Sequence, residues 1–383
     1  MKLISSGTET IAGLPKPLPG SDEERHMLRA LELAELGRGT ASPNPMVGAL
    51  VVEGGEVLGE GYHRRAGEPH AEVGAVEKAG ERARGATIYV TLEPCAHPGR
   101  TPPCAELLVR AGLARVVIAM RDPNPLVAGK GAKELSDAGI EVVEGLYGDI
   151  AAIQNEAYTK WITTGRPFVT LKMAMSIDGK AATRTGDSRW VSSDASRLDV
   201  HRMRAESDAV MVGVGTVLAD DPELTAREVA AVRQPVRVVA DGLAATPPDS
   251  RLADTSVART IVAVSKDSTV EDRNALEEKG IEIVEAGNGP IVDLDALLTA
   301  LGQREVTSVL AEGGPSLAAS LWEAGLVDKL VFYVAPKVVG GSEAPGPIGG
   351  RGVNEMYDAG DVEIFTVETI GPDLKIVAYP RGG

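Results

Sequence analysis

The stretch TLEPCAHPGRTPPC, Thr91 to Cys104, contains both cysteines of this 383-residue chain. The N-terminal MKLISSGTETIAGLPKPLPG lacks the continuous apolar segment of a secretory signal, so we expect a cytoplasmic protein. In a reducing compartment, paired cysteines are more often metal ligands or catalytic groups than a disulfide. The loop therefore predicts a metal site or a catalytic site.

A His-x-Glu pattern, His70-Ala71-Glu72, supplies the groups that this loop lacks. Zinc binds about four ligands tetrahedrally, and a catalytic zinc keeps one position for water. His70, Cys95 and Cys104 would provide three ligands, and Glu72 would move a proton from the water to a leaving amine, as in zinc deaminases. The alternatives are a surface histidine with two buried cysteines, or a redox disulfide.

Residues two apart on a helix, such as His70 and Glu72, point to nearly opposite sides. They can reach one point only if it lies beyond the N-terminal end of the helix in EPHAEVGAVEKAG. Cys104 follows two prolines and begins the helical segment CAELLVRAG. Two helix N-termini at one ion would favour thiolate and hydroxide, because the helix dipole is positive there.

Helical and strand patterns alternate in the first part of the chain, after residues 1–20, which we expect to be a flexible leader. Helical spacing follows Ser21, and MVGALVVEGGEVLGEGYH reads as a hairpin with its turn at EGG. Strands and helices then alternate up to about Asp149, which is typical of a layered α/β domain. We predict a deaminase domain over residues 21–149 and a connecting segment over 150–166.

A second alternating series begins at FVTLKMAMSIDG and continues toward the end of the chain. Its β-rich runs include DAVMVGVGTVL, PVRVVAD, RTIVAVS, IEIVEA, VTSVLAEGG and KLVFYVAPKVVG. The pattern predicts a second α/β domain over residues 167–383. Its glycine fragment Gly213-Val214-Gly215 falls short of a dinucleotide fingerprint, so the residues alone leave nucleotide binding open.

Charge and composition argue against two classes of partner. The net charge is −16, which opposes binding to a nucleic acid, and aromatic residues for base stacking make up only 3% of the chain. No apolar run is long enough to span a bilayer, so we expect no membrane partner. Small-molecule chemistry is the better prediction.

The cysteine spacing separates this chain from nucleoside and nucleic-acid deaminases, which have a Cys-x-x-Cys pattern where AHPGRTPP intervenes here. With this loop and SPNPMVGA, Ser42 to Ala49, the chain closely resembles the bifunctional riboflavin-biosynthesis deaminase/reductase family from about Ser21 onward. The resemblance implies a cytidine-deaminase-like three-layer αβα domain followed by a dihydrofolate-reductase-like α/β domain.

The resemblance also implies two consecutive reactions and a homo-oligomer, either a dimer or a tetramer. The first reaction is zinc-dependent hydrolytic deamination of 2,5-diamino-6-(5-phosphoribosylamino)pyrimidin-4(3H)-one. The second is NADPH reduction of the ribosyl chain of 5-amino-6-(5-phosphoribosylamino)uracil to ribityl. Two alternatives stay open: another zinc nucleobase deaminase with an accessory nucleotide-binding domain, and a binding protein with a structural zinc.

In the deaminase half, the resemblance implies residues that contact the phosphoribosylated pyrimidine, besides the Zn²⁺ ligands and Glu72. Asn44 would read the pyrimidine edge, and His63, His97 and Arg100 would contact substrate and its phosphate, for which arginine offers paired donors. The alternatives are a plain turn residue at Asn44 and a solvated surface role for His63 and Arg100.

In the reductase half, the segments LKMAMSIDGK, GDSRWVSS, HRMRAESDAVMVGVGTVLADDPELTAR and LAEGGPSL carry the resemblance. It implies substrate contacts from Lys172, Ser188, Arg204, Leu224, Arg227 and Glu312, and NADPH contacts from Ala174, Trp190, Thr216, Asp220, Gly314, Pro315, Ser316 and Leu317. A glycine turn that opens a helix suits phosphate binding. The alternatives are a wet strand edge for Lys172, a core aromatic for Trp190 and a turn cluster for Asp220.

Overall fold

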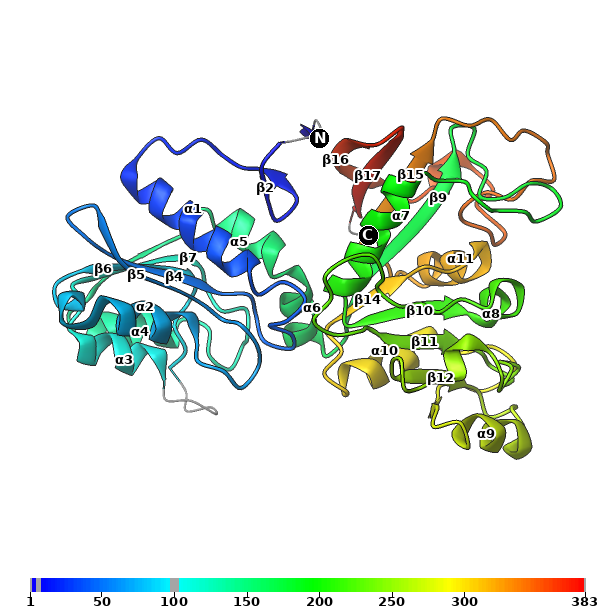
Figure 1. Ribbon diagram of the computed structural model, residues 1–383, viewed down its shortest axis with the longest axis horizontal. Coiled ribbons are helices and arrows are strands. Elements are labelled where there is room, and N and C mark those ends of the chain that lie inside the picture. The colour runs from blue at the N-terminus through cyan, green and yellow to red at the C-terminus, as the bar shows by residue number, and fades with distance from the viewer. Residues whose placement is uncertain (1, 5–7, 97–102, 382–383) are drawn as a thin grey trace. The chain divides into compact units, whose positions relative to one another are not determined.

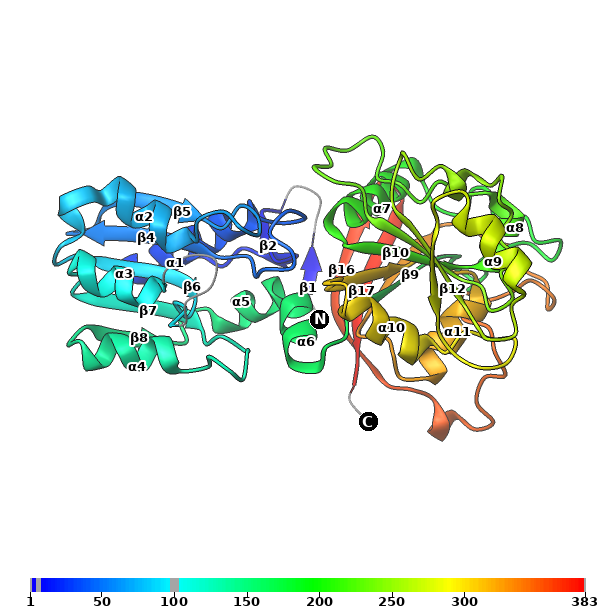
Figure 2. The same cartoon turned by 90° about the horizontal axis from the view of Figure 1, so that it is seen from below.

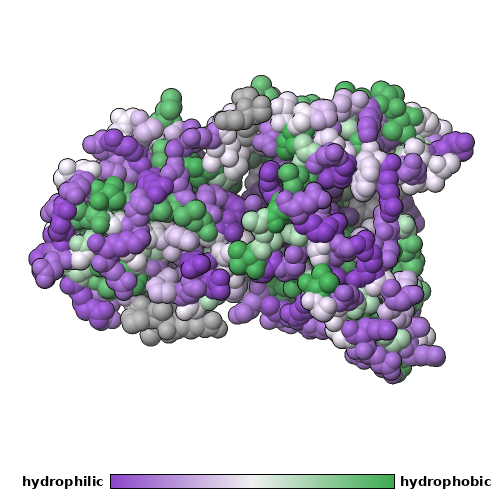
Figure 3. All heavy atoms as spheres, in the orientation of Figure 1, coloured by the Kyte–Doolittle hydropathy of each residue, from purple (hydrophilic) through white to green (hydrophobic). Residues whose placement is uncertain are grey.

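The computed structural model describes residues 2–4, 8–96 and 103–381. The chain divides into two compact units, Thr8–Gly165 and Arg166–Gly383, and the second unit also includes Met1–Gly7. No helix in these described ranges is long and apolar enough to cross a membrane. The face seen in Figure 3 is largely hydrophilic, with hydrophobic residues in small groups.

The N-terminal unit is built on a five-stranded sheet with the order β5-β4-β6-β7-β8 in the described residues. Its strands are β4 (Gly48–Glu53), β5 (Glu56–Tyr62), β6 (Thr87–Leu92), β7 (Arg115–Met120) and β8 (Glu141–Glu144). Strand β4 is antiparallel to β5 and β6, whereas β6, β7 and β8 are parallel. Parallel β6 and β7 therefore end at the same edge of the sheet.

Helices cover both faces of this sheet (Figure 1), which confirms the expected three-layer αβα arrangement. Helices α1 (Asp22–Glu35) and α5 (Gly148–Gln154) lie on one face; α2 (Ala71–Ala79), α3 (Cys104–Ala111) and α4 (Lys130–Asp137) lie on the other. The short η1 (Gly80–Ala83) follows α2, and α6 (Glu156–Thr164) ends the unit. The apolar cluster between the sheet and α2, α3 and α4 includes Ala75, Leu108 and Leu135.

Local signals explain where these elements begin and turn. The Ser21 hydroxyl accepts a hydrogen bond from the Glu24 N–H at 3.2 Å and caps α1, as its position before an acidic turn predicts. Gly54 and Gly55 have φ values of 56° and 84° and make the β4–β5 turn, where the sequence predicted a hairpin.

Glycines on β4 and β5 let two helices approach the strands to backbone contact. A Cβ atom added at Gly48 would lie 1.9 Å from the Ala30 carbonyl oxygen of α1. A Cβ atom at Gly61 would lie 2.1 Å from the Ala71 carbonyl oxygen, in the first turn of α2. The missing side chain of Gly61 therefore determines how closely the N-terminus of α2 lies against the sheet.

The C-terminal unit is built on a ten-stranded sheet in the described residues, with the order β1-β16-β17-β15-β9-β14-β10-β11-β12-β13. Figure 2 labels β9, β10 and β12 of this sheet, with β16 and β17. Its strands are β1 (Lys2–Ile4), β9 (Phe168–Ser176), β10 (Ala209–Gly213), β11 (Val236–Ala240), β12 (Thr260–Val264), β13 (Glu282–Glu285), β14 (Ser308–Ala311), β15 (Lys329–Ala335), β16 (Val362–Ile370) and β17 (Asp373–Pro380). From β15 to β13 the strands are parallel, whereas β17 is antiparallel to both β15 and β16.

Helices lie on both faces of this second sheet. Helices α10 (Leu294–Gly302) and α11 (Pro315–Glu323) pack on one face through Leu297 and Leu321. Helices α7 (Asp194–Glu206), α8 (Val214–Asp220) and α9 (Val270–Glu277) pack on the other. Single helical turns are present at η2 (Arg251–Ala253) and η3 (Met356–Asp358). A parallel sheet covered in this way agrees with the α/β class expected for this half.

The N-terminal residues differ from the expected flexible leader. Strand β1 pairs in parallel with β16, with Leu3 opposite Val367. Strands β2 (Thr10–Ile11) and β3 (Leu14–Pro15) form a small hairpin in which Ile11 and Leu14 are buried. Burial of these two apolar side chains explains why the segment folds rather than staying extended in solvent. Helix α5 and the β16–β17 hairpin were not predicted from the sequence.

Substitution of Gly61 tests the close approach of α2. We expect Gly61→Ala to lower the free energy of unfolding by about 1–3 kcal/mol, because the added methyl would overlap the Ala71 carbonyl. Gly74→Ala is the matched control, since its Cβ atom would lie an ordinary 3.6 Å from the Gly61 Cα atom. We expect the control to stabilise α2 by about 1 kcal/mol.

Differential scanning calorimetry of both full-length variants measures these changes. An unchanged or raised melting temperature in Gly61→Ala would show that the hairpin and α2 are not held at backbone contact.

Candidate functional site

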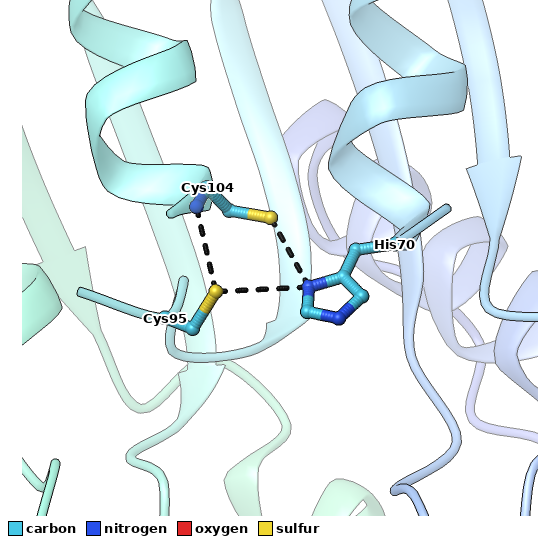
Figure 4. Close-up of side chains that lie close together, drawn as sticks. All are labelled: His70, Cys95 and Cys104. Atoms are coloured by element: carbon cyan, nitrogen blue, oxygen red, sulfur yellow. Dashed lines mark hydrogen bonds between the residues drawn. The ribbon is translucent and has the colours of Figure 1, made fainter. Parts of the chain in front are cut away.

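Three side chains from separate elements meet beside the first sheet (Figure 4). The ligand atoms of His70, Cys95 and Cys104 all lie within 4.8 Å of one another. The His70 Nδ1 atom is 3.3 Å from the Cys104 Sγ atom and 3.6 Å from the Cys95 Sγ atom. The structure thus brings together the three residues that the sequence predicted as metal ligands.

The ends of two helices and one strand position these ligands. His70 is the N-cap of α2, and Cys104 is the first residue of α3. Cys95 follows the end of β6, and its sulfur accepts a hydrogen bond from the Cys104 N–H at 3.4 Å. The arrangement agrees with the expectation that the site lies beyond helix N-termini, where backbone N–H groups and the helix dipole favour thiolate.

The site favours a bound cation. The pKa of Cys95 is lowered to about 4, mainly by its hydrogen bond with Cys104 and to a smaller extent by its hydrogen bond with His70. The hydrogen bond to Cys95 and burial raise the pKa of Cys104, because a second thiolate here would lie beside the first. A divalent cation removes this repulsion and lets both sulfurs bind as thiolates. One imidazole nitrogen and two thiolates form a donor set that fits zinc.

Glu72 lies in the first turn of α2 and is only 3% exposed. Burial raises the pKa of its carboxyl group, although the neighbouring His70 opposes the shift. A carboxyl group with a raised pKa can both accept and release a proton near neutral pH. Glu72 therefore has the properties of a proton carrier.

The segment that precedes Cys95 is held by a carboxylate that the sequence analysis did not single out. The buried Glu93 accepts hydrogen bonds from the backbone N–H groups of Gly129 at 2.9 Å, Ala132 at 3.1 Å and Asp122 at 3.3 Å. These bonds join the end of β6 to the start of α4. The partners of Glu93 lie far along the chain, so no local pattern identified its role.

Two predicted substrate-binding residues contact each other beside the cluster. The Asn44 Nδ2 atom and the His63 Nε2 atom are 2.9 Å apart, and His63 Nδ1 is 3.2 Å from the Pro69 carbonyl oxygen. An amide donor at Nε2 requires the hydrogen to be on Nδ1, which then donates to Pro69. His63 is 3% exposed, so a solvated surface role for it is wrong. His97 and Arg100 lie outside the described residues.

In the second unit, three charged side chains form a cluster that is largely shielded from solvent, with 17% of the Lys172 side chain, 13% of Arg204 and 8% of Glu312 exposed. Arg204 binds Glu312 through two hydrogen bonds of 2.5 and 2.9 Å, and the Lys172 Nζ atom is 4.0 Å from the Glu312 carboxylate. Burial lowers the pKa of Lys172. Burial acts to raise the pKa of Glu312, but Arg204 and Lys172 outweigh it and hold this pKa below its usual value. The alternative of a wet strand edge for Lys172 is therefore wrong.

Of the other predicted substrate-binding residues of this unit, Arg227 and Leu224 are connected to the cluster through Thr225, whereas Ser188 is not. The Arg204 Nη1 atom donates to the Thr225 carbonyl at 3.1 Å, and Arg227 Nη1 donates to the Thr225 hydroxyl at 3.0 Å. Leu224 is buried beside Thr225 in the chain and has a φ of 54°. Ser188 is exposed between β9 and α7, and no described hydrogen bond joins it to the cluster.

The predicted cofactor-binding residues include two adjacent helix starts. Gly314 is the N-cap of α11, with Pro315, Ser316 and Leu317 in its first turn. A Cβ atom at Gly314 would lie 3.7 Å from the Thr216 Oγ1 atom of α8, so the two helix starts lie side by side. Glycine turns that open helices can receive phosphate oxygens on free N–H groups, so this region fits a dinucleotide phosphate.

Three further predicted cofactor contacts lie outside these two helix starts. Trp190 is 63% exposed, with the Arg197 guanidinium 4.4 Å from its ring centroid, so the alternative of a core aromatic is wrong. Asp220 ends α8 and pairs with Arg189 at 2.9 Å. Ala174 lies half-buried on β9.

Comparison with known proteins follows the same division of the chain. Residues 20–120 match the model of the cytidine and deoxycytidylate deaminase zinc-binding region, and residues 167–376 match that of the RibD C-terminal domain. The chain is 44% identical over 361 residues to the riboflavin biosynthesis protein RibD of Bacillus amyloliquefaciens, covering 94% of this chain and 97% of that protein. It is 43% identical over 369 residues to RibD of Escherichia coli, covering 92% and 98% respectively.

Solved structures give the same result. Acinetobacter baumannii RibD superposes with a TM-score of 0.86 and 39% identity, covering 94% of this chain and 99% of that one. A diaminohydroxyphosphoribosylaminopyrimidine deaminase/5-amino-6-(5-phosphoribosylamino)uracil reductase from Thermotoga maritima superposes with a TM-score of 0.83, 35% identity and the same coverage. The chain therefore belongs to the RibD family of riboflavin biosynthesis proteins, with a cytidine-deaminase-like domain followed by a dihydrofolate-reductase-like domain.

Proposed function

We propose that this chain catalyses two consecutive reactions of riboflavin biosynthesis on one phosphoribosylated pyrimidine. The N-terminal unit hydrolyses the amine of 2,5-diamino-6-(5-phosphoribosylamino)pyrimidin-4(3H)-one. The C-terminal unit reduces the ribosyl chain of 5-amino-6-(5-phosphoribosylamino)uracil with NADPH. The observation that carries the proposal is the His70, Cys95 and Cys104 cluster with the buried Glu72 beside it.

In the deaminase unit, His70, Cys95 and Cys104 would hold zinc and leave a fourth position open. Zinc, when bound, acts as a Lewis acid that makes water a good nucleophile at neutral pH. The Glu72 carboxylate accepts a proton from the attacking water and passes it to the amine, which leaves as ammonia while oxygen takes its place on the ring. Its raised pKa suits both transfers.

Substrate placement in this unit is the role proposed for Asn44 and His63. The Asn44 amide offers both a donor and an acceptor to a pyrimidine edge, and His63 holds the amide through a 2.9 Å contact. His97 and Arg100 are proposed to contact the substrate and its phosphate on the strength of the loop motif.

In the reductase unit, Lys172, Ser188, Arg204, Leu224, Arg227 and Glu312 are proposed to bind the substrate. NADPH supplies the hydride, so the unit needs no nucleophile of its own and acts by placing the two reactants. Arg204 donates from Nε and Nη2 to Glu312 and from Nη1 to the Thr225 carbonyl. One N–H on each of Nη1 and Nη2 is left over, and these two are proposed to bind the substrate phosphate.

The NADPH phosphates are proposed to lie at the start of α11, against Gly314, Pro315, Ser316 and Leu317. Ala174, Trp190, Thr216 and Asp220 complete the proposed cofactor contacts. The alternative of another zinc nucleobase deaminase with an accessory nucleotide-binding domain is not supported, because residues 167–376 match the RibD C-terminal domain. The homo-oligomeric state and the cytoplasmic location stay predictions.

A mass spectrum of the product formed from the diaminopyrimidine ribotide with NADPH tests the whole proposal. We expect a product that has exchanged its amine for oxygen and gained two hydrogens. Deaminated but unreduced product would contradict the reductase assignment, and unchanged substrate with zinc-loaded protein would contradict the substrate assignment.

Glu72→Gln tests the proton carrier. We expect deamination to slow by about 10²–10⁴-fold, because the amide cannot accept and return the proton. Zinc content and reduction of the deaminated substrate should stay at wild-type levels, which excludes a folding defect. Ammonia release at close to the wild-type rate would show that another group moves the proton.

The pH dependence of reduction tests the charge on Lys172, which faces Glu312, Arg204 and the Tyr333 ring. Above its pKa the ammonium loses its proton, and the site loses a positive charge. Since burial lowers this pKa, kcat/KM should fall with rising pH before the usual lysine value of 10.5 is reached. Lys172→Arg should move the fall to higher pH; an identical profile in both proteins would contradict the role of Lys172.

A further inference from the structure

Met46 lies two residues before the start of β4, at a point where β6 no longer pairs with this part of the chain. On one side of β4, the His63 N–H donates to the Val47 carbonyl at 2.9 Å and extends the pairing with β5. Backbone groups of successive residues alternate between the two neighbours of a strand, so those of Met46 and Gly48 face the β6 side. The Gly48 N–H already finds a side chain there, the Thr91 hydroxyl at 3.1 Å.

Strand β6 cannot pair with Met46, because it turns toward the metal cluster. The β4–β6 register places Ala49 opposite Val90, so its extension would place Met46 opposite Glu93. The Glu93 N–H instead donates to the Met120 carbonyl at 3.0 Å, on the β7 side. The chain then continues through Pro94 to Cys95. The turn of β6 away from β4 brings Cys95 to the metal cluster. In the described residues, the same turn leaves the Met46 N–H and carbonyl without a partner on a neighbouring strand.

A side-chain amide takes the place of the missing strand. The Asn155 Oδ1 atom accepts from the Met46 N–H at 2.8 Å, and Asn155 Nδ2 donates to the Met46 carbonyl at 3.0 Å. Asn155 lies between α5 and α6, is 2% exposed, and also donates to the Ala151 carbonyl at 3.4 Å. These three contacts determine the orientation of the amide, since a flipped amide would oppose donor to donor and acceptor to acceptor.

We propose that Asn155 is a positioning residue for deamination. Its amide holds the Met46 backbone, and through it Asn44, which lies two residues earlier and contacts His63 at 2.9 Å. The segment that the sequence presented only as a connection between domains therefore supports the substrate side of the deaminase site. The inference rests on the proposed role of Asn44 in binding the pyrimidine.

The test compares Asn155→Asp with the wild-type holoenzyme. Asp has the shape of Asn, but its second oxygen would face the Met46 carbonyl and repel it. We expect KM for the diaminopyrimidine ribotide to rise about tenfold, because a misplaced Asn44 loses its hydrogen bonds to the ring. The kcat of deamination, the zinc content and the reductase activity of the same chain should stay close to wild type.

Gln154→Ala is the matched control. Gln154 is buried next to Asn155, but its amide donates to the Leu31 carbonyl and to Glu35, not to Met46. We expect this variant to leave KM unchanged. A general loosening of the α5–α6 junction would instead reduce the amount of active enzyme, which lowers kcat without raising KM, and would act equally in both variants.

Two further measurements keep the inference separate from the proposed function. Hydrogen exchange at the Met46 amide should be faster in Asn155→Ala, which removes the acceptor of this N–H, than in wild type or Gln154→Ala, whatever the substrate is. In an Asn44→Ala background, Asn155→Asp should add no further rise in KM, since both changes act on one contact. An unchanged KM in Asn155→Asp would overturn the positioning role, and so would effects on KM that are fully additive with those of Asn44→Ala. A wild-type enzyme that does not deaminate the ribotide would instead overturn the proposed function.

Discussion

The deaminase unit depends on two helix N-termini that meet at one point. Helix α2 presents His70 and Glu72 there, and α3 presents Cys104. Contact of the α2 backbone with Gly61 places the first of these ends, and the hydrogen bonds of Glu93 with α4 place the strand end that leads to Cys95. The sheet therefore supports three possible metal ligands that come from distant parts of the chain.

In the reductase unit, the main feature is a cluster of charged side chains whose charges do not cancel. Lys172, Arg204 and Glu312 lie together and largely out of solvent, and two positive charges face one negative charge. Removal of charges from water is costly unless they are paired, and here the pairing leaves a surplus of positive charge. An anionic substrate such as a phosphoribosyl compound would balance this surplus. A local surplus of this kind would suit an anionic substrate even in a chain with a net charge of −16.

Local features of the fold and the site could be predicted from the sequence, whereas long-range contacts could not. The Ser21 cap, the Gly54-Gly55 turn and the helix starts at His70 and Cys104 all have local signatures. Asn155 and Met46 are 109 residues apart, and contact between a side-chain amide and a backbone leaves no periodic pattern. Strand β1 was missed for the same reason, because its partner β16 lies near the other end of the chain.

The most direct test of the account is X-ray absorption at the zinc edge, measured on the full-length protein with zinc bound. Ligation by His70, Cys95 and Cys104 with one open position predicts two sulfur atoms at about 2.3 Å and nitrogen or oxygen atoms at about 2.0–2.1 Å. Addition of a pyrimidine deaminase inhibitor that replaces the water at zinc should change only the nitrogen and oxygen atoms around the metal (the light-atom shell), not the two sulfur atoms. A zinc environment with fewer than two sulfur atoms, or a light-atom shell that stays the same in both states, would contradict a catalytic zinc at the two helix ends.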